Sequence, residues 1–401
     1  MVLTEVDLQE GNQPISLEQS KQQKKPSELA MACQGKQSKH VSLALLSVAW
    51  FVFLSSCKAN PGSKAETEAL LKWKKSLPDQ PILKSWVAHI NSTASSPCQW
   101  RGIACNDEGS VTEIYLNYTG LKGTLENLDF PSFPNLLRLD LKFNNLTGTI
   151  PMNIGTLSKL QFLDLSTNSL NGSLPLSLAN LTKVYEIDVS RNNITGELER
   201  RLFPDGASLS KTGLISLKNF LLQDNDLGGR IPEEIGNLKH LVILVLDFNH
   251  FCGPLPPSLG NLSDLEILLV GQNQLSGQIP VSIGTLKLIV VSLYFNRLSG
   301  SVPEEIGNIS SLVSLQLAEN NFNGHLPQQV CQGGKLVNFS AAFNHFTGPI
   351  PVSLKHCRSL NRVLLQHNQL TGYIDQDFGV YPNLTYIDLS YNSLRGKISP
   401  N

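Results

Sequence analysis

Residues 136–151 read LLRLDLKFNNLTGTIP, and residues 160–175 read LQFLDLSTNSLNGSLP. Both fit the template L-x-x-L-x-L-x-x-N-x-L-x-G-x-I-P, with asparagine at position nine and glycine at position thirteen. Twelve copies of this template follow one another, with first positions at 111, 136, 160, 184, 217, 241, 265, 288, 312, 336, 360 and 384. Consecutive copies are 23 to 25 residues apart in ten of the eleven steps. A fixed period of this length indicates stacked repeats and not several globular domains.

The leucines at positions four and six predict a short strand in every copy, since alternate residues of a strand point to one face. Stacking then builds a parallel β-sheet on the concave face, and the segment after Ile-Pro predicts short helical turns on the convex face. The period and template are those of leucine-rich repeats. The expected fold is therefore a leucine-rich-repeat solenoid, an α/β-type right-handed superhelix. Its twelve repeats span residues 111–401, and we expect them to be truncated without a C-terminal cap.

Two polar or small positions are invariant or nearly so within the repeats. Asparagine occupies position nine in eleven copies, with Thr119 in the first. A buried amide there can satisfy backbone N–H and C=O groups of neighbouring coils. Glycine occupies position thirteen in all twelve copies, from Gly123 to Gly396. A tight bend against the next coil leaves little room for a Cβ atom, which favours glycine.

Residues 60–110 precede the repeats and predict an N-terminal cap. The segment Glu66–Leu77 has the apolar spacing of a helix. We expect Cys98 and Cys105 to form a disulfide over the first coil, with Trp100 packed on its edge. Cys331 and Cys357 lie in corresponding convex segments of successive coils, which predicts a second disulfide. Cys252 is then unpaired, and we expect it to be a buried small residue.

The first 59 residues indicate a targeting segment and not a part of the folded domain. Residues 41–57 carry no charge, follow Lys36 and Lys39, and end in small residues. This pattern predicts a signal peptide over residues 31–59, with a membrane anchor as the alternative. Residues 1–30 read as an unstructured upstream extension from an alternative start. The chain is therefore expected in the secretory pathway, at the extracellular side of the plasma membrane or in the apoplast.

Charge and motifs exclude several classes of function. The 32 basic and 33 acidic side chains give a net charge of −1, so no basic field is present to bind nucleic acid. The triplet Asp377-Phe378-Gly379 matches one kinase motif, but the Gly-rich loop, strand lysine and catalytic loop of a kinase are missing. No Ser/His/Asp grouping and no metal-ligand spacing stands out. We expect no enzymatic activity, no cofactor and no metal.

The segments CQWRGIAC (98–105) and IPEEIGNL (231–238), with the N-x-L-x-G-x-I-P consensus, resemble the extracellular domains of plant leucine-rich-repeat receptor-like kinases. Residues 210–392 further resemble the male-discoverer-interacting receptor-like kinase group. The resemblance implies a peptide or protein ligand, a co-receptor kinase ectodomain as a further partner, and membrane attachment through a C-terminal part missing here or through an uncleaved anchor. Two alternatives remain open: a secreted inhibitor of a pathogen cell-wall hydrolase, and a non-catalytic co-receptor or scaffold.

Positions three, five, seven and eight of the template face the concave solvent side. Position five holds Asp140, Asp164 and Asp188 in copies two to four and becomes apolar in the next three copies. Adjacent apolar side chains form a stripe, which predicts a binding surface. The predicted ligand-binding residues are Leu221, Ile243, Val245, Asp247, Phe248, Ile267, Leu269, Gln272, Val290, Ser292, Tyr294, Phe295, Gln316 and Phe343. We expect an extended peptide to lie there, with Asp247, Gln272, Ser292 and Gln316 supplying hydrogen bonds.

Glycosylation sequons are consistent with this placement. Ten are present: Asn91, Asn117, Asn145, Asn171, Asn180, Asn193, Asn261, Asn308, Asn338 and Asn383. By template position Asn117 and Asn338 face the concave side, whereas Asn261 and Asn308 lie on the convex side. The concave window from Leu217 to Lys335 therefore contains no sequon. Because a glycan would obstruct docking, this window is the part of the concave face left free for a ligand.

Overall fold

The computed structural model describes residues 61–87, 96–206, 212–377 and 379–397, all within one compact unit. These ranges comprise the N-terminal cap and the repeats. The expected upstream extension, the signal peptide and the sequon at Asn91 lie outside the described residues. None of the helices in the described part has the length and apolar character that crossing a bilayer requires.

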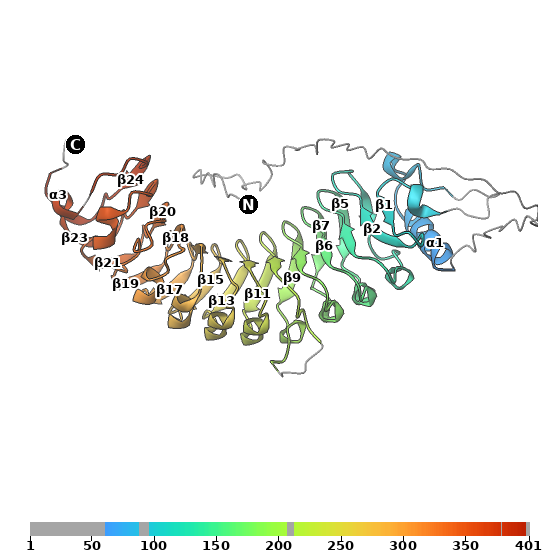
Figure 1. The fold of residues 1–401 in the computed structure, drawn as a ribbon, viewed down its shortest axis with the longest axis horizontal. Helices are drawn as coiled ribbons and strands as arrows, with labels where there is room; N and C mark the ends of the chain where they lie inside the picture. Colours follow the sequence, from blue (N-terminus) through green and yellow to red (C-terminus); the bar gives the residue numbers. More distant parts are fainter. Residues whose placement is uncertain (1–60, 88–95, 207–211, 378, 398–401) are drawn as a thin grey trace, which may run out of the picture. The chain divides into compact units, whose positions relative to one another are not determined.

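One strand per coil builds the principal sheet, as predicted (Figure 1). Twelve strands pair in parallel through template positions three to five, and a thirteenth, β1 (Ile103–Cys105), pairs antiparallel with the first of them. In the first eleven coils the apolar side chains at positions four and six point into the solenoid and are buried, whereas Ile387 and Leu389 of the twelfth are not fully covered. The parallel strands are β2 (Val111–Tyr115), β4 (Arg138–Asp140), β6 (Phe162–Asp164), β8 (Glu186–Asp188), β10 (Asn219–Leu221), β12 (Ile243–Val245), β14 (Ile267–Leu269), β16 (Val290–Ser292), β18 (Ser314–Gln316), β20 (Asn338–Ser340), β22 (Arg362–Leu364) and β24 (Tyr386–Asp388).

The asparagine at position nine joins each coil to the coil before it. The amide nitrogen of Asn249 donates to the carbonyl of Leu222 in the preceding coil at 3.0 Å and to that of Leu246 in its own coil at 3.2 Å. Its amide oxygen accepts from the backbone N–H of Leu227 at 3.0 Å. The same set of bonds recurs at the other asparagines of this position, from Asn144 to Asn392. The predicted role of these amides is confirmed.

A second parallel sheet follows the asparagines, and the sequence did not predict it. Eleven of its twelve short strands end at or just beyond the glycine of position thirteen, and β25 ends one residue before it. The backbone turns there with positive φ, as at Gly148 (φ 79°) and Gly277 (φ 77°). A Cβ atom at residue 148 would lie 3.2 Å from the side chain of Thr124 in the preceding coil. The positive φ and this close contact both favour glycine at the position. The strands are β3 (Lys122–Thr124), β5 (Asn145–Thr149), β7 (Ser169–Gly172), β9 (Asn193–Glu197), β11 (Asp226–Arg230), β13 (His250–Gly253), β15 (Gln274–Gly277), β17 (Arg297–Gly300), β19 (Asn321–His325), β21 (His345–Gly348), β23 (Gln369–Tyr373) and β25 (Ser393–Arg395).

The convex side carries the expected short helical turns, most of them 3-10 helices one turn long. The proline that precedes them has φ near −65° and begins the turn. Buried isoleucines and leucines such as Ile235 and Leu259 fix each turn to the core. The 3-10 turns of the repeats are Phe130–Ser132, Met152–Thr156, Leu176–Asn180, Arg200–Leu202, Glu233–Asn237, Pro257–Asn261, Val281–Thr285 and Val352–His356, and two α-helical turns are α2 (Glu304–Gly307) and α3 (Ile374–Asp377).

The cap closes the first coil with one helix and three tryptophans. Helix α1 (Pro61–Ser76) buries Trp73, whose indole N–H donates to the carbonyl of Thr124 at 2.8 Å. Trp86 packs between Trp73 and Trp100, with ring centroids 6.1 and 5.6 Å away. Two further 3-10 turns, Pro81–Leu83 and Pro97–Gln99, complete this region. Trp86 was not singled out in the sequence, because the template has no position for it.

The cysteines pair as the sequence indicated, with one correction. Disulfides join Cys98 to Cys105 in the cap and Cys331 to Cys357 between successive convex segments. Cys252 is unpaired, but it is exposed and not buried as expected. It lies on β13, where buried Phe251 points into the core, so alternation along the strand turns the cysteine outward.

The asparagine bonds generate the first prediction. Replacing buried Asn249 with alanine leaves the backbone N–H of Leu227 without this partner and removes one amide bond to each of the carbonyls of Leu222 and Leu246, which keep their bonds from Asn225 and Asn273. Since an unsatisfied buried group costs about 1–3 kcal/mol and each lost hydrogen bond about 1 kcal/mol, we expect Asn249→Ala to lower the free energy of unfolding by about 3 kcal/mol. Urea unfolding followed by circular dichroism measures this loss. The matched control is Asn323→Ala, at an exposed position of β19, which should change stability little; equal losses in both variants would contradict the assigned role.

Candidate ligand-binding surface

The predicted apolar stripe lies on strands β10 to β18, which stand side by side in the principal sheet (Figure 1). Parallel register pairs Asn219 with Ile243, Ile243 with Ile267 and Ile267 with Val290, which aligns position three along a row. Position five forms a second row through Leu221, Val245, Leu269 and Ser292. Val245 and Ser292 are buried. The other apolar side chains of both rows are half-buried, and so are those of Gln272, Tyr294 and Gln316.

Three of the predicted contact residues are much less accessible than expected. Val245, Asp247 and Ser292 are 7%, 9% and 4% exposed. Positions five and seven lie in the middle of a closely spaced parallel sheet, so larger neighbouring side chains cover them. The Oγ atom of Ser292 has no hydrogen-bond partner among the described residues. A ligand on this surface would reach only the tops of these three side chains.

Aromatic side chains at position eight border the stripe. Phe248, Phe295 and Phe343 are about half exposed. In all twelve coils the residue at this position adopts the left-handed conformation, with φ between 47° and 59°. Phe248 and Phe295 line a shallow depression of about 300 Å³ that Gln272 and His250 also line. The left-handed backbone thus holds two phenylalanine rings on either side of one hollow at the edge of the stripe.

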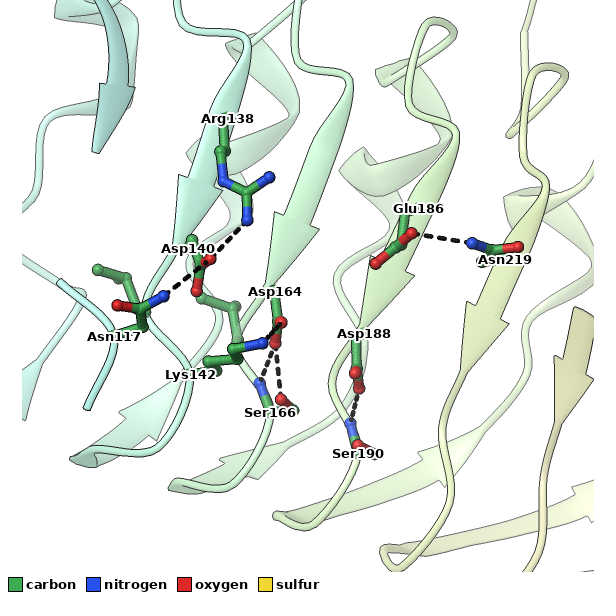
Figure 2. Close-up of polar contacts among 12 residues, drawn as sticks. Asn117, Arg138, Asp140, Lys142, Asp164, Ser166, Glu186, Asp188, Ser190 and Asn219 are labelled. Atoms are coloured by element: carbon green, nitrogen blue, oxygen red, sulfur yellow. Dashed lines mark hydrogen bonds and ion pairs between the residues drawn. The ribbon is translucent and has the colours of Figure 1, made fainter. Parts of the chain in front are cut away.

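The acidic ladder of copies two to four differs from the exposed row that the sequence suggested (Figure 2). Asp140 and Asp164 are almost completely buried, and register places Asp164 between Asp140 and Asp188. The Arg138 guanidinium donates to Asp140 at 2.6 Å, and its plane lies 3.7 Å from the centre of the Phe162 ring.

Two more cationic or polar groups face the ladder. The Lys142 ammonium lies 3.6 Å from a carboxylate oxygen of Asp164, and Asn117 donates to Asp140 at 3.2 Å. Ser166 and Ser190 donate from their backbone N–H groups to Asp164 and Asp188. Sequence reasoning missed the roles of Arg138 and Lys142, although their template positions, three and seven of copy two, could have indicated them.

Burial and like charges change the titration of this ladder. Loss of water contact, together with the neighbouring Asp140, raises the pKa of Asp164. Burial also raises the pKa of Asp188 to about 6, and the charges of Asp164 and Glu186 act in the same direction. Ionising the carboxyl groups of Asp164 and Asp188, in the N-terminal third of the concave sheet, therefore costs free energy in the folded state.

The sequons are distributed around the stripe. Asn117 on the first coil and Asn338 on β20 are half-buried on the concave sheet, on either side of β10 to β18. Seven others are exposed along the second sheet or the convex side: Asn145, Asn171, Asn180, Asn193, Asn261, Asn308 and Asn383. None of the ten lies on strands β10 to β18. No group of three or more metal-ligating side chains occurs among the described residues.

Comparisons with known proteins agree with this architecture. Residues 63–106 match the leucine-rich-repeat N-terminal domain, and residues 135–157, 159–181, 216–238, 240–262 and 383–401 match the leucine-rich repeat. The chain is thus a leucine-rich-repeat protein with an N-terminal cap domain, and the matches cover only these regions and no kinase domain.

Its relatives are plant receptor-like kinases. A leucine-rich-repeat receptor-like protein kinase of Arabidopsis thaliana is 40% identical over 105 residues, which is 26% of this chain and 9% of the relative. MDIS1-interacting receptor like kinase 2 of the same plant is 36% identical over 132 residues, which is 33% of this chain and 12% of the relative. The aligned part is therefore about a tenth of the length of these relatives.

Two solved structures of Arabidopsis ectodomains are similar over most of the solenoid. The ectodomain of the receptor kinase GASSHO1/SCHENGEN3, in complex with Casparian strip integrity factor 2, has a TM-score of 0.73 and 29% identity, covering 84% of this chain and 42% of that one. The HAESA ectodomain, in complex with an IDA peptide hormone, has a TM-score of 0.69 and 30% identity, covering 84% and 59%. Both neighbours are receptor ectodomains that hold a ligand.

The raised pKa of Asp188 generates the second prediction. A carboxyl group whose pKa is higher in the fold (about 6) than in the open chain (3.8) stabilises the fold only while protonated. Its contribution is complete below pH 3.8 and is lost as the pH rises through 6. Asp188→Leu, which copies Leu221 of the next coil, should therefore gain stability relative to the parent as the pH rises from 4 to 7.5. Thermal melts across this range measure the gain.

The pH dependence separates charge from packing. An apolar contact added by Asp188→Leu shifts the melting temperature equally at every pH. Asp107→Asn, at an exposed turn of the cap, is the matched control and should show no pH-dependent difference. A constant gain for Asp188→Leu from pH 4 to 7.5 would disprove the charge assignment.

Proposed function

We propose that this chain is an extracellular ligand-recognition domain that binds a peptide or protein signal on strands β10 to β18. One observation carries the proposal: four neighbouring strands, β10 to β16 of the principal sheet, present half-buried apolar side chains in aligned rows, bordered by exposed phenylalanines and free of sequons. Exposed apolar rows of this extent are typical of interaction surfaces. The peptide complexes of similar ectodomains support the same use of the fold.

The stripe suits an extended chain better than a compact small molecule. Position three repeats from strand to strand in register, so Ile243, Ile267 and Val290 offer apolar contacts at a regular spacing of about 4.8 Å. The depression between Phe248 and Phe295 is shallow and open, and it can take one side chain. The polar groups at the border, Gln272 and Gln316, can bond to the backbone of such a peptide.

The proposal also includes secretion, attachment to a plasma membrane and signalling through a kinase. We propose that a longer relative or a partner protein supplies these functions. The resemblance to receptor-like kinases supports them, as does the exposure of seven sequons around the repeats. A co-receptor ectodomain that contacts the solenoid beside the ligand is part of the same proposal.

A glycan placed inside the stripe tests the surface directly. Val290→Asn creates the sequence Asn-Val-Ser on β16, at the same template position as the natural sequon of Asn338. The secreted chain is first used to select binders from a phage-displayed library of random peptides. We expect Val290→Asn to abolish capture of the selected pool, because a glycan at position three covers the neighbouring rows.

The control variant introduces a polar amide at residue 290 without creating a glycosylation site. Val290→Gln carries an amide but no sequon, and it should retain most of the capture. Mass spectrometry confirms that the asparagine variant is glycosylated. A library that yields no binders on the parent chain, or a glycosylated Val290→Asn that still captures the pool, would contradict recognition on this surface.

A further inference from the structure

Asp247 lies beneath the middle of the apolar stripe. It follows β12 at template position seven, where the corresponding residues of the next two coils are Gly271 and Tyr294. Its carboxylate accepts a hydrogen bond from the backbone N–H of Gly271, and its side chain is 9% exposed. The position-five neighbours Val245 and Leu269 are apolar.

Gly271 creates the space that this arrangement needs. A Cβ atom at residue 271 would overlap two ring carbons of Tyr294 and lie 3.2 Å from the carboxylate of Asp247. Without it, the Tyr294 ring lies across coil seven, and its hydroxyl accepts a hydrogen bond from the Gln272 amide at 3.3 Å. The tyrosine therefore covers the approach to Asp247 from one side and presents an aromatic face beside it.

Asp247 differs from the other buried carboxylates of the concave sheet. Asp140 and Asp164 each have a basic side chain within 4.0 Å, namely Arg138 and Lys142. Within the described ranges, no lysine, arginine or histidine lies within that distance of Asp247. Burial, opposed only by the Gly271 bond, raises its pKa to about 7. Asp247 is thus a desolvated carboxylate that no cation of the described residues pairs with, which is a costly state for a fold by itself.

The surroundings favour a cation from outside. Tyr294 is a titratable group beside Asp247. Burial raises the pKa of Tyr294 to about 12, and the negative charges of Asp247 and Glu319 act in the same direction. Phe248, the residue after Asp247, and Phe295 are exposed at the edge of the hollow. Aromatic faces attract ammonium and guanidinium groups, and their apolar rims accommodate the methylene stem of a long side chain.

We propose that Asp247 binds the lysine or arginine side chain of a peptide that lies over β12 to β18, with Tyr294 and the two phenylalanines enclosing its stem. This inference rests on the proposed function and specifies its ligand: a peptide with one cationic residue between apolar residues. The carboxylate is already out of water before the ligand arrives, so pairing requires little further desolvation of the receptor. Specificity for charge is then combined with an otherwise apolar surface.

The test uses the same random peptide library, selected on the secreted parent chain and on Asp247→Asn. We expect the parent to enrich lysine or arginine at one position of the selected peptides and the variant to lose that enrichment. Synthetic peptides from the parent pool should bind Asp247→Asn about thirtyfold more weakly or worse, because one partner of a buried charge pair is gone. The matched control is Asp224→Asn, an exposed carboxylate at position eight of the preceding coil, which should keep the affinity.

The pH profile provides a second readout that a purely structural role would not move. The affinity of the parent for these peptides should fall as the pH decreases below 7, by up to about tenfold per unit, while that of Asp247→Asn stays level. Circular dichroism and thermal melts establish that both variants are folded.

The outcomes separate this inference from the proposed function. Peptides selected without a cationic position, or unchanged binding to Asp247→Asn, would overturn the inference and leave recognition by the stripe standing. A loss of affinity in Asp224→Asn equal to that in Asp247→Asn would also overturn it, because exposed charge would then suffice. Failure of the parent chain to select any peptide would overturn both.

Discussion

The structure depends on one side-chain amide per coil. In eleven coils the asparagine at position nine donates to carbonyls of its own coil and of the preceding coil and accepts an N–H from the preceding coil, as Asn273 does with Leu246, Val270 and Phe251. These bonds hold each coil at a set rotation relative to the last. The leucines are thereby kept inside, and positions three, five, seven and eight are kept on the concave side. The proposed ligand-binding surface is a consequence of this stacking.

Backbone hydrogen bonds between coils support an unfavourable backbone conformation. Position eight has positive φ in every coil although no glycine occurs among its twelve residues, which costs of the order of 1 kcal/mol each. The N–H groups of Phe248 and Asn249 donate to the carbonyls of Gly271 and Gln272 in the next coil, and these contacts compensate the strain. The left-handed turn also leaves Phe248 and Phe295 exposed at the edge of the stripe, where the proposed ligand would contact them.

The buried carboxylates of the concave sheet have two kinds of surroundings. Near the cap, basic side chains of the second coil pair with Asp140 and Asp164, and Arg138 also stacks on Phe162. In the sixth coil Asp247 accepts one backbone N–H and has no basic partner among the described residues. Both arrangements occur at template positions that would ordinarily be solvated, and both arise because parallel strands crowd neighbouring side chains together. Asp140 and Asp164 have cationic partners within the chain, whereas for Asp247 we propose a cation from a ligand.

Periodicity alone was sufficient to predict the strands, the inward leucines, the asparagine bonds and the Cys331–Cys357 disulfide, because each depends on where a residue falls within one repeat. It was insufficient for Trp86, for the second sheet and for the positive φ at position eight, where the twelve side chains share no chemical signature. It also misjudged Cys252, which strand alternation turns outward, and Val245, Asp247 and Ser292, which are buried. Burial of these last three depends on the size of side chains one or two coils away, such as Tyr294 reaching over Gly271. That contact depends on how the coils stack, since Asp247, Gly271 and Tyr294 are 23 to 47 residues apart along the chain.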